Sequence, residues 1–202
     1  AYNNLGAAYY LAGNLSAAAE AWDRSLAIKP TRSAYSNTGT MYFYLGDYET
    51  AAERFIQAAD FAPRDHRPWG NLADAFYFTD SKRHVATVIY KQAIEFAEER
   101  IQVNPLDMET IAMSAHYFAR SGNDEKARQR IATAQAGAPE DIYVQYYSAL
   151  VAAQLGDTDD ALAHIERAIA LDYKKELLRV DPGLSSLSGL KEFRQLVAED
   201  GR

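Results

Sequence analysis

Apolar residues recur along this chain at positions i, i+3, i+4 and i+7, the spacing that forms one stripe on a helix. The stripes come in pairs of segments. The first segments of three pairs carry aromatic, aliphatic and small residues at these steps: Tyr2, Leu5, Gly6 and Tyr9; Tyr35, Thr38, Gly39 and Tyr42; Trp69, Leu72, Ala73 and Phe76. The second segments carry alanines around one large residue: Ala18, Trp22 and Leu26; Ala51, Phe55 and Ala58; Ala127, Ile131 and Ala134; Ala161, Ile165 and Ala168. The pattern predicts an all-α chain.

Glycine and proline mark the ends of the predicted helices. A glycine followed by asparagine or aspartate ends the first helix of four pairs: Gly13-Asn14, Gly46-Asp47, Gly122-Asn123 and Gly156-Asp157. Glycine suits this place because it tolerates the left-handed backbone after a helix. A proline follows the second helix of four pairs, at Pro30, Pro63, Pro105 and Pro139, and Tyr173 takes that place in the last pair. These signals predict five helical hairpins, each of which can bury its apolar face only against a neighbouring hairpin.

This spacing resembles the tetratricopeptide repeat, which runs aromatic, Leu-Gly, Tyr, Gly, Ala, aromatic, Ala, Pro over about 34 residues. The resemblance covers about 170 of the 202 residues in five copies. It implies a right-handed superhelix, or α-solenoid, of five hairpins with a C-terminal capping helix. Copies four and five depart at the Leu-Gly step, where Ser114-Ala115 and Ser148-Ala149 stand. Small residues are kept there, so we expect the close packing to survive.

We expect a single domain over residues 1–202, within a longer protein. Its predicted repeats span about 1–31, 32–64, 65–106, 107–140 and 141–173, and a capping segment spans 174–202. Within that segment a helix at about 189–199 would cover the last apolar face of the stack, and its apolar residues are Leu190, Phe193, Leu196 and Val197.

The third repeat is longer than the others. Pro63 and Pro105 lie 42 residues apart, and the apolar pattern of the second helix continues through Ala97 and Ile101. The sequence predicts about two extra turns, or roughly 10 Å, on this helix. This unit and the ending that starts at Asp181-Pro182-Gly183-Leu184 resemble the C-terminal repeat arrays of certain bacterial signalling proteins. In those proteins the repeats follow a serine/threonine kinase, an adenylate cyclase or a winged-helix domain, often with a TolB-like segment between. The resemblance implies a regulatory or docking part without catalytic residues.

Composition and charge limit the kinds of partner that we expect this chain to bind. The net charge of −7 argues against nucleic acid, and no apolar stretch approaches the roughly 18 residues that cross a bilayer. Without cysteine, the chain has no disulfide, thiolate nucleophile or cysteine-ligated zinc. The sequence does not determine the cellular compartment, although we favour the cytoplasm over the periplasm.

In the tetratricopeptide family the first helix of each hairpin lines a concave groove. Counting in that register, the groove positions include one asparagine per repeat, at Asn4, Asn37 and Asn71. The nearby aromatic residues are Tyr10, Phe43, Tyr44, Tyr77 and Phe78. Amides can donate to and accept from a peptide backbone, and aromatic rings add apolar contact. This ladder resembles the peptide-holding groove of the O-linked N-acetylglucosamine transferase repeats and implies that a protein or extended peptide binds here.

In the second half of the chain the predicted groove lining changes to a mixed set: Glu109, Met113, His116, Arg120, Tyr146, Tyr147 and Leu150. Two interpretations of the asparagine ladder stay open. It either binds a peptide or reflects only the repeat consensus, because asparagine is also the commonest consensus residue at that position. A clamp for a partner's C-terminal carboxylate is disfavoured, since the matching positions lack its basic residues. Self-association as a homodimer, or a purely structural role, is the alternative to peptide binding.

We predict no catalysis and no cofactor or metal. The histidines His66, His84, His116 and His164 lie in different repeats without metal spacing, and we expect them on the surface or the groove wall. No glycine-rich phosphate loop or hydrolase motif occurs.

Overall fold

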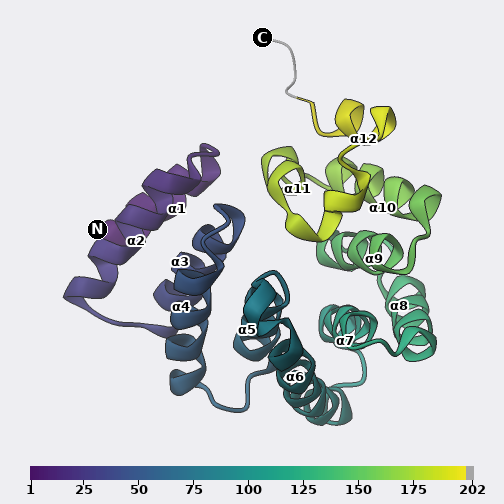
Figure 1. Cartoon of the computed structure of the whole chain (residues 1–202), viewed down its shortest axis with the longest axis horizontal. Coiled ribbons are helices and arrows are strands. Elements are labelled where there is room, and N and C mark those ends of the chain that lie inside the picture. The colour runs from purple at the N-terminus through teal and green to yellow at the C-terminus, as the bar shows by residue number, and fades with distance from the viewer. Residues whose placement is uncertain (199–202) are drawn as a thin grey trace. The chain divides into compact units, whose positions relative to one another are not determined.

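The computed structural model describes residues 1–198, in which helix is the only regular secondary structure (Figure 1). The first helices of five hairpins are α1 (Tyr2–Leu11), α3 (Arg32–Tyr44), α5 (His66–Tyr77), α7 (Met108–Arg120) and α9 (Ile142–Leu155). Their second helices are α2 (Leu15–Ile28), α4 (Tyr48–Phe61), α6 (Arg83–Val103), α8 (Asp124–Gly137) and α10 (Thr158–Ala170). The prediction of an all-α helical-repeat solenoid fold with five hairpins is confirmed.

The predicted glycine turns between the two helices of a hairpin are also present. Gly13, Gly46, Gly122 and Gly156 all take positive φ angles, between 75° and 82°, where a side chain would be strained. The residue after three of them begins the second helix as an N-cap: the side chains of Asn14, Asp47 and Asn123 each accept a hydrogen bond from a backbone N–H three residues on. The sequence pair therefore ends one helix and starts the next within two residues.

The hairpins group into two compact units. Unit 1 is residues 1–96, and unit 2 begins at Ala97. Phe96 and Ala97 are neighbours in the long helix α6, so the division falls within that helix.

In unit 1 the paired helices approach closely at glycine. A Cβ atom on Gly6 would lie 2.7 Å from the Trp22 ring, and one on Gly39 would lie 2.7 Å from the Phe55 ring. Trp22 and Phe55 are 3% and 2% exposed, so each ring is buried between helices. The small residue of the repeat pattern thus makes room for the large residue of the partner helix.

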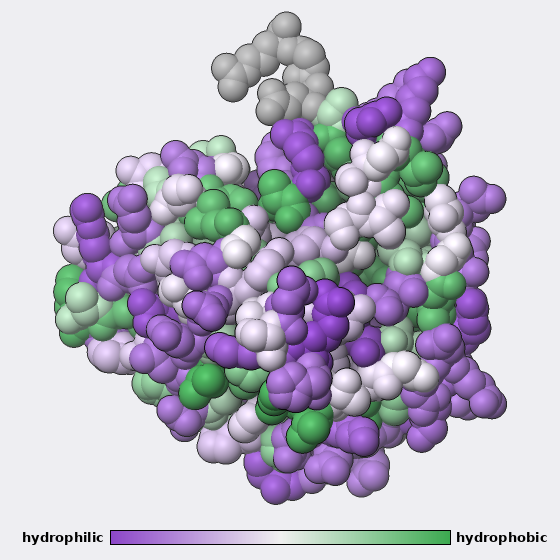
Figure 2. Space-filling model, in the orientation of Figure 1, coloured by the Kyte–Doolittle hydropathy of each residue, from purple (hydrophilic) through white to green (hydrophobic). Residues whose placement is uncertain are grey.

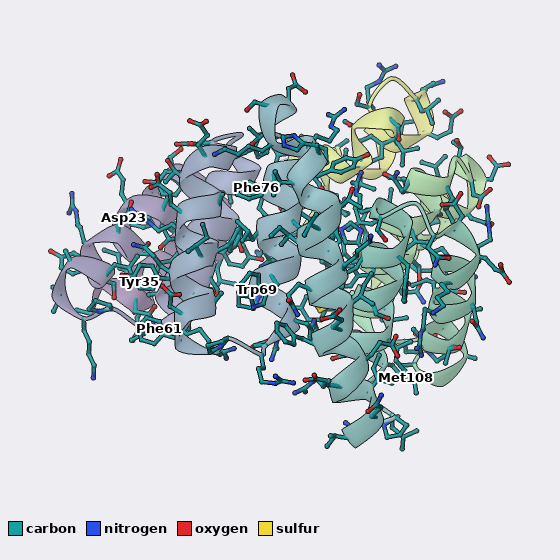
Figure 3. The ribbon with its side chains drawn as sticks, turned by 60° about the horizontal axis from the view of Figure 1, so that its bottom comes forward. Asp23, Tyr35, Phe61, Trp69, Phe76 and Met108 are labelled. Carbon is teal, nitrogen blue, oxygen red and sulfur yellow. The ribbon has the colours of Figure 1, made fainter. Side chains whose placement is uncertain are left out.

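A polar contact links the first two hairpins of unit 1. The Tyr42 hydroxyl donates to Asp23 at 2.6 Å, and the Arg54 guanidinium donates to the other oxygen of that carboxylate at 3.1 Å (Asp23 is labelled in Figure 3). The hydrogen bond to Asp23, with burial, raises the pKa of Tyr42 to about 12. Tyr42 therefore stays a neutral donor throughout the ordinary pH range.

Helix α6 has 21 residues, against 14 in α2 and in α4, which confirms the predicted lengthening. A 3₁₀ turn, η1 (Asp80–Lys82), precedes it in place of the glycine turn. Ala97 and Ile101 in the added turns are buried, and Val103 at the end is 87% exposed. The Arg130 guanidinium on α8 donates to the Glu98 carboxylate at 2.6 Å. The added turns are thus docked along their length, and only the tip projects.

Three short elements follow the last hairpin: α11 (Lys175–Val180), η2 (Pro182–Leu187) and α12 (Lys191–Leu196). The predicted helix at about 189–199 is shorter than expected, and its last position lies outside the described residues. Phe193 and Val197 are buried in a cluster with Ala161 and Ile165 of α10, so α12 does cover the last hairpin. No helix in residues 1–198 has the length and apolar character needed to cross a bilayer.

Candidate functional site

The three asparagines predicted as ligand contacts lie at one register position in unit 1. Asn4 and Asn37 each stand two residues before a glycine that faces the second helix of its own hairpin. Asn71 stands two residues before Ala73, which is fully buried. Two residues turn a helix by about 200°, so each amide points away from the second helix. We call this side of α1, α3 and α5 the asparagine face.

The amides of the asparagine face make no hydrogen bond to any described residue of the chain. Asn4 is exposed, and Asn37 and Asn71 are half-buried. Each amide offers two N–H donors and one oxygen acceptor. All of this capacity is available to a ligand.

The charged side chains of the first helices in unit 1 are already engaged. Helix α1 carries none, and Arg32 and Arg67 both form ion pairs with Asp65. The Asp74 carboxylate accepts a hydrogen bond from the Tyr90 hydroxyl at 2.5 Å. The asparagine face is therefore polar without presenting a charge of its own.

Four of the five predicted aromatic residues gather at the C-terminal ends of α3 and α5. The Phe43 ring lies 5.8 Å from both the Tyr44 and the Phe78 ring, and the Tyr77 and Phe78 rings are 5.2 Å apart. Tyr48, the first residue of α4, joins them at 5.5 Å from Phe43. No periodic signal pointed to Tyr48, because it stands outside the first-helix stripe. We call these five residues the aromatic cluster.

Tyr44 and Phe78 connect this cluster to the asparagine face. Each follows the asparagine of its helix by seven residues, which is nearly two full turns, so both lie on the same side of the helix about 10 Å further along. Tyr10 lies elsewhere: its ring is 6.4 Å from Trp22, and it packs against the core around Ala18 and Met41.

Basic residues lie at the edge of the aromatic cluster. The Arg83 guanidinium sits 5.2 Å from the Tyr77 ring centre, and its Nε donates to the Tyr77 carbonyl oxygen at 2.9 Å. The Lys82 ammonium lies 5.2 Å from the Phe76 ring centre. Figure 2 shows that hydrophilic residues cover most of the visible surface and that hydrophobic ones form small separate groups. On the face that Figure 2 shows, apolar contact to a ligand is therefore limited to small local sites.

The predicted lining of the second half is not an open surface. Met113, His116, Arg120 and Leu150 are all less than 10% exposed, and Glu109, Tyr146 and Tyr147 are half-buried. The prediction that this mixed set lines the ligand groove is therefore wrong for Met113, His116, Arg120 and Leu150, which are buried. Part of this burial comes from the C-terminal segment, because Leu150 and Arg120 lie against its residue Gly183.

Two histidines also differ from the prediction of surface positions. His66 and His116 are 1% and 3% exposed, so they are core residues of α5 and α7. His116 lies in an aromatic group, with its ring 5.9 Å from that of Tyr147.

His164 on α10 belongs to a hydrogen-bonded chain within unit 2. Its Nδ1 is 2.7 Å from Gln145 Oε1, and its Nε2 is 3.0 Å from Gln135 Nε2. An amide nitrogen can only donate, so Nε2 accepts and the imidazole is neutral with its proton on Nδ1. Gln135 also donates to the Ser148 hydroxyl at 3.0 Å. Gln135, Ser148 and His164 line a cleft of about 380 Å³ between α8, α9 and α10, but they already form hydrogen bonds within this chain of groups.

Burial lowers the pKa of His164 below its ordinary value, and the nearby Arg167 acts in the same direction. An unfolded histidine, with a pKa of about 6.5, then takes up protons before the folded one does. We expect the free energy of unfolding of unit 2 to fall as the pH drops below about 6.5 and to level off below the folded pKa. Urea unfolding followed from neutral to about pH 5 measures this slope. His164→Gln keeps a polar side chain but cannot titrate, so part of the slope should vanish; identical profiles would contradict the assignment.

Known proteins contain the same repeat. Models described as tetratricopeptide repeat match residues 1–32 and residues 113–173. The chain is similar to the crystal structure of TTC0263, a thermophilic tetratricopeptide protein of Thermus thermophilus. The TM-score is 0.64, with 23% identity over 92% of this chain and 97% of that one. It is also similar to MamA from Desulfovibrio magneticus RS-1, with a TM-score of 0.51 and 17% identity over 85% of this chain and 93% of that one. A comparison with curated proteins finds no match.

These likenesses show a shared fold. The molecule is a helical-repeat protein in which hairpins stack through alternating small and large residues. In particular, residues 1–32 and 113–173 match tetratricopeptide-repeat models, and the chain as a whole has the fold of a tetratricopeptide-repeat protein.

Proposed function

We propose that unit 1 is a protein-interaction module that binds an extended, uncharged segment of a partner protein along the asparagine face. The observation that carries this proposal is the set of three amides at one register position, none of which is used inside the described protein. The amide recurs at this position in all three first helices of unit 1, and no described residue of the chain engages it. An extended backbone presents alternating donors and acceptors, which amides match on both counts.

The spacing of the helices suits such a ligand. Packed helices lie about 8–10 Å apart, and an extended chain advances about 3.3 Å per residue. Helices α3 and α5 approach each other, so Asn37 and Asn71 could meet residues about three apart in such a segment, whereas α1 and α3 have little direct contact and Asn4 would meet a residue further along. The absence of an unengaged charge on the first helices of unit 1 favours a neutral segment, because a buried unpaired charge is costly.

The aromatic cluster would receive an apolar side chain at one end of the segment. Tyr44 and Phe78 lie on the same side of their helices as Asn37 and Asn71, and both are only half-buried, so part of each residue is exposed to solvent. Rings already packed against one another lose little entropy when a ligand binds.

Replacing Asn37 and Asn71 together by alanine should weaken a bound peptide about 10- to 100-fold, because each amide hydrogen bond is worth about 0.5–1.5 kcal/mol. The peptide would come from an array of uncharged extended sequences probed with the full chain, and fluorescence polarisation would measure its affinity. Asn3→Ala, next to Asn4 but turned about 100° from it, is the matched control and should change nothing.

An unchanged affinity in the double variant would refute the asparagine face as the site. If the array yields no peptide and light scattering shows a concentration-dependent dimer, self-association is the function instead. A strict monomer that binds peptide excludes that alternative.

We further propose that this module is the docking part of a larger signalling protein. The support is the likeness of the elongated third repeat and of the Asp181-Pro182-Gly183-Leu184 ending to the repeat arrays of bacterial regulators. The complete open reading frame tests this directly: a kinase, cyclase or winged-helix domain in the same chain is the expected finding, and an array encoded alone would refute it.

A further inference from the structure

The C-terminal segment from Asp181 to Leu187 lies on the first helices of unit 2. The Tyr146 hydroxyl of α9 donates to Asp181 Oδ2 at 2.6 Å. A Cβ atom on Gly183 would lie 2.8 Å from Leu150 Cδ2 and 3.1 Å from Arg120 Nη2. Helix η2 packs against α9 along its length.

The side chains beneath this segment stand at the same repeat positions in unit 2 as the residues of the asparagine face and its aromatic neighbour Tyr44 do in unit 1. Tyr147 stands nine residues before Gly156, as Asn37 stands nine before Gly46. Leu150 follows Tyr147 by three residues and so shares its side of α9. Arg120 stands two residues before Gly122, which is the place of Tyr44 in unit 1. In unit 2 the chain itself thus covers the side of the first helices that unit 1 leaves open.

Each part of the segment is held by a separate group. The Asp181 carboxylate is 5% exposed; one oxygen accepts from Tyr146 and the other from the Gly183 N–H at 2.7 Å. The Tyr146 ring is itself fixed, stacked 4.6 Å from Tyr173. Gly183 lies close enough to Leu150 and Arg120 that a Cβ atom there would require their side-chain ends to move, and Leu184 and Leu187 are 1% and 2% exposed within the apolar cluster around Leu150.

A carboxylate, a glycine and two leucines three residues apart are the elements by which a protein surface selects a short peptide. We propose that the first-helix face of unit 2 is a recognition site for an Asp-x-Gly-Leu-x-x-Leu segment and that residues 181–187 fill it within the same chain. This site goes beyond the proposed function, which concerns unit 1.

The test uses a fluorescein-labelled peptide with the sequence of residues 181–190 and the full chain carrying Gly183→Val. A Cβ atom at this position already meets the side-chain ends of Leu150 and Arg120, so we expect the larger valine side chain to displace the segment and open the site. Gly189→Val is the matched control, since a Cβ there meets nothing within 4 Å. We expect the peptide to bind Gly183→Val at least about 100-fold more tightly than the wild type or the control, with hydrogen-exchange protection mapped to α9.

Tyr146→Phe, added to Gly183→Val, should weaken the peptide about tenfold, and so should asparagine in place of the peptide's aspartate, because each removes the carboxylate contact. If the Gly183→Val variant loses its helical circular dichroism, Asp181→Asn is the replacement, because it loosens the segment more gently. We expect the Asp181→Asn variant to bind the peptide about tenfold more tightly than the wild type.

Equal binding to wild type and opened variants, or no binding to a folded opened variant, would overturn the proposal. Such a failure is distinct from failure of the proposed function, which is read at Asn37 and Asn71 in unit 1.

Discussion

Replacing Phe55 by alanine is expected to lower the free energy of unfolding of unit 1 by about 3–5 kcal/mol, the range for large aromatic residues in a core. Phe55 is 2% exposed and fills the space that Gly39 leaves on α3. Its cluster also includes Leu72 of the next hairpin, so the cavity would weaken two helix interfaces at once. In a repeat stack each hairpin depends on its neighbours, so the loss should spread beyond α4. Urea unfolding by circular dichroism measures the total, and hydrogen exchange of α3 and α4 locates it.

Phe61→Ala is the matched control, because Phe61 lies on the same helix but is 54% exposed. Its ring is 5.9 Å from that of Tyr35 at the far end of the hairpin (both are labelled in Figure 3), so we expect a loss of about 1 kcal/mol or less. If Phe55→Ala and Phe61→Ala cost the same, the glycine-aromatic fit does not hold the hairpin together.

The hairpins of this protein could be predicted because their signals are local and repeated. The positive φ angle at Gly46 and the cap at Asp47 are each set by residues within one turn of the chain. The extra turns of α6 were visible because Ala97 and Ile101 continue a stripe that a shorter helix would have ended. The shared register of Asn4, Asn37 and Asn71 follows from the same repeat.

What could not be predicted depends on contacts between distant and irregular segments. Residues 181–187 fall outside the repeat pattern, so nothing local indicated that they lie on α9, and the side chains beneath them were therefore predicted to line the groove. Asp181 illustrates the difficulty: its partner Tyr146 is 35 residues away. The burial of His66 and His116 was missed because a single polar residue on a helix does not indicate which neighbour covers it.

Leu184→Ala is expected to lower the free energy of unfolding of unit 2 by about 2–5 kcal/mol. Leu184 is 1% exposed and packs in one cluster with Leu178, Leu187 and Ile165, so its removal leaves a cavity between the C-terminal segment and the last hairpin. Because η2 lies against α9, the amides of α9 should exchange hydrogen faster in this variant than in the wild type. Urea unfolding and hydrogen exchange by mass spectrometry give the two measurements.

Ser186→Ala is the control for this change, since Ser186 lies in the same short helix with an exposed side chain. A surface substitution of this kind typically changes stability by no more than about 0.5 kcal/mol. If Leu184→Ala behaved like Ser186→Ala, the segment would contribute nothing to the core of unit 2 and its contact with α9 would be incidental. A loss confined to Leu184→Ala, with faster exchange in α9, would instead show that the C-terminal segment stabilises the apolar interior of unit 2 through its contact with α9.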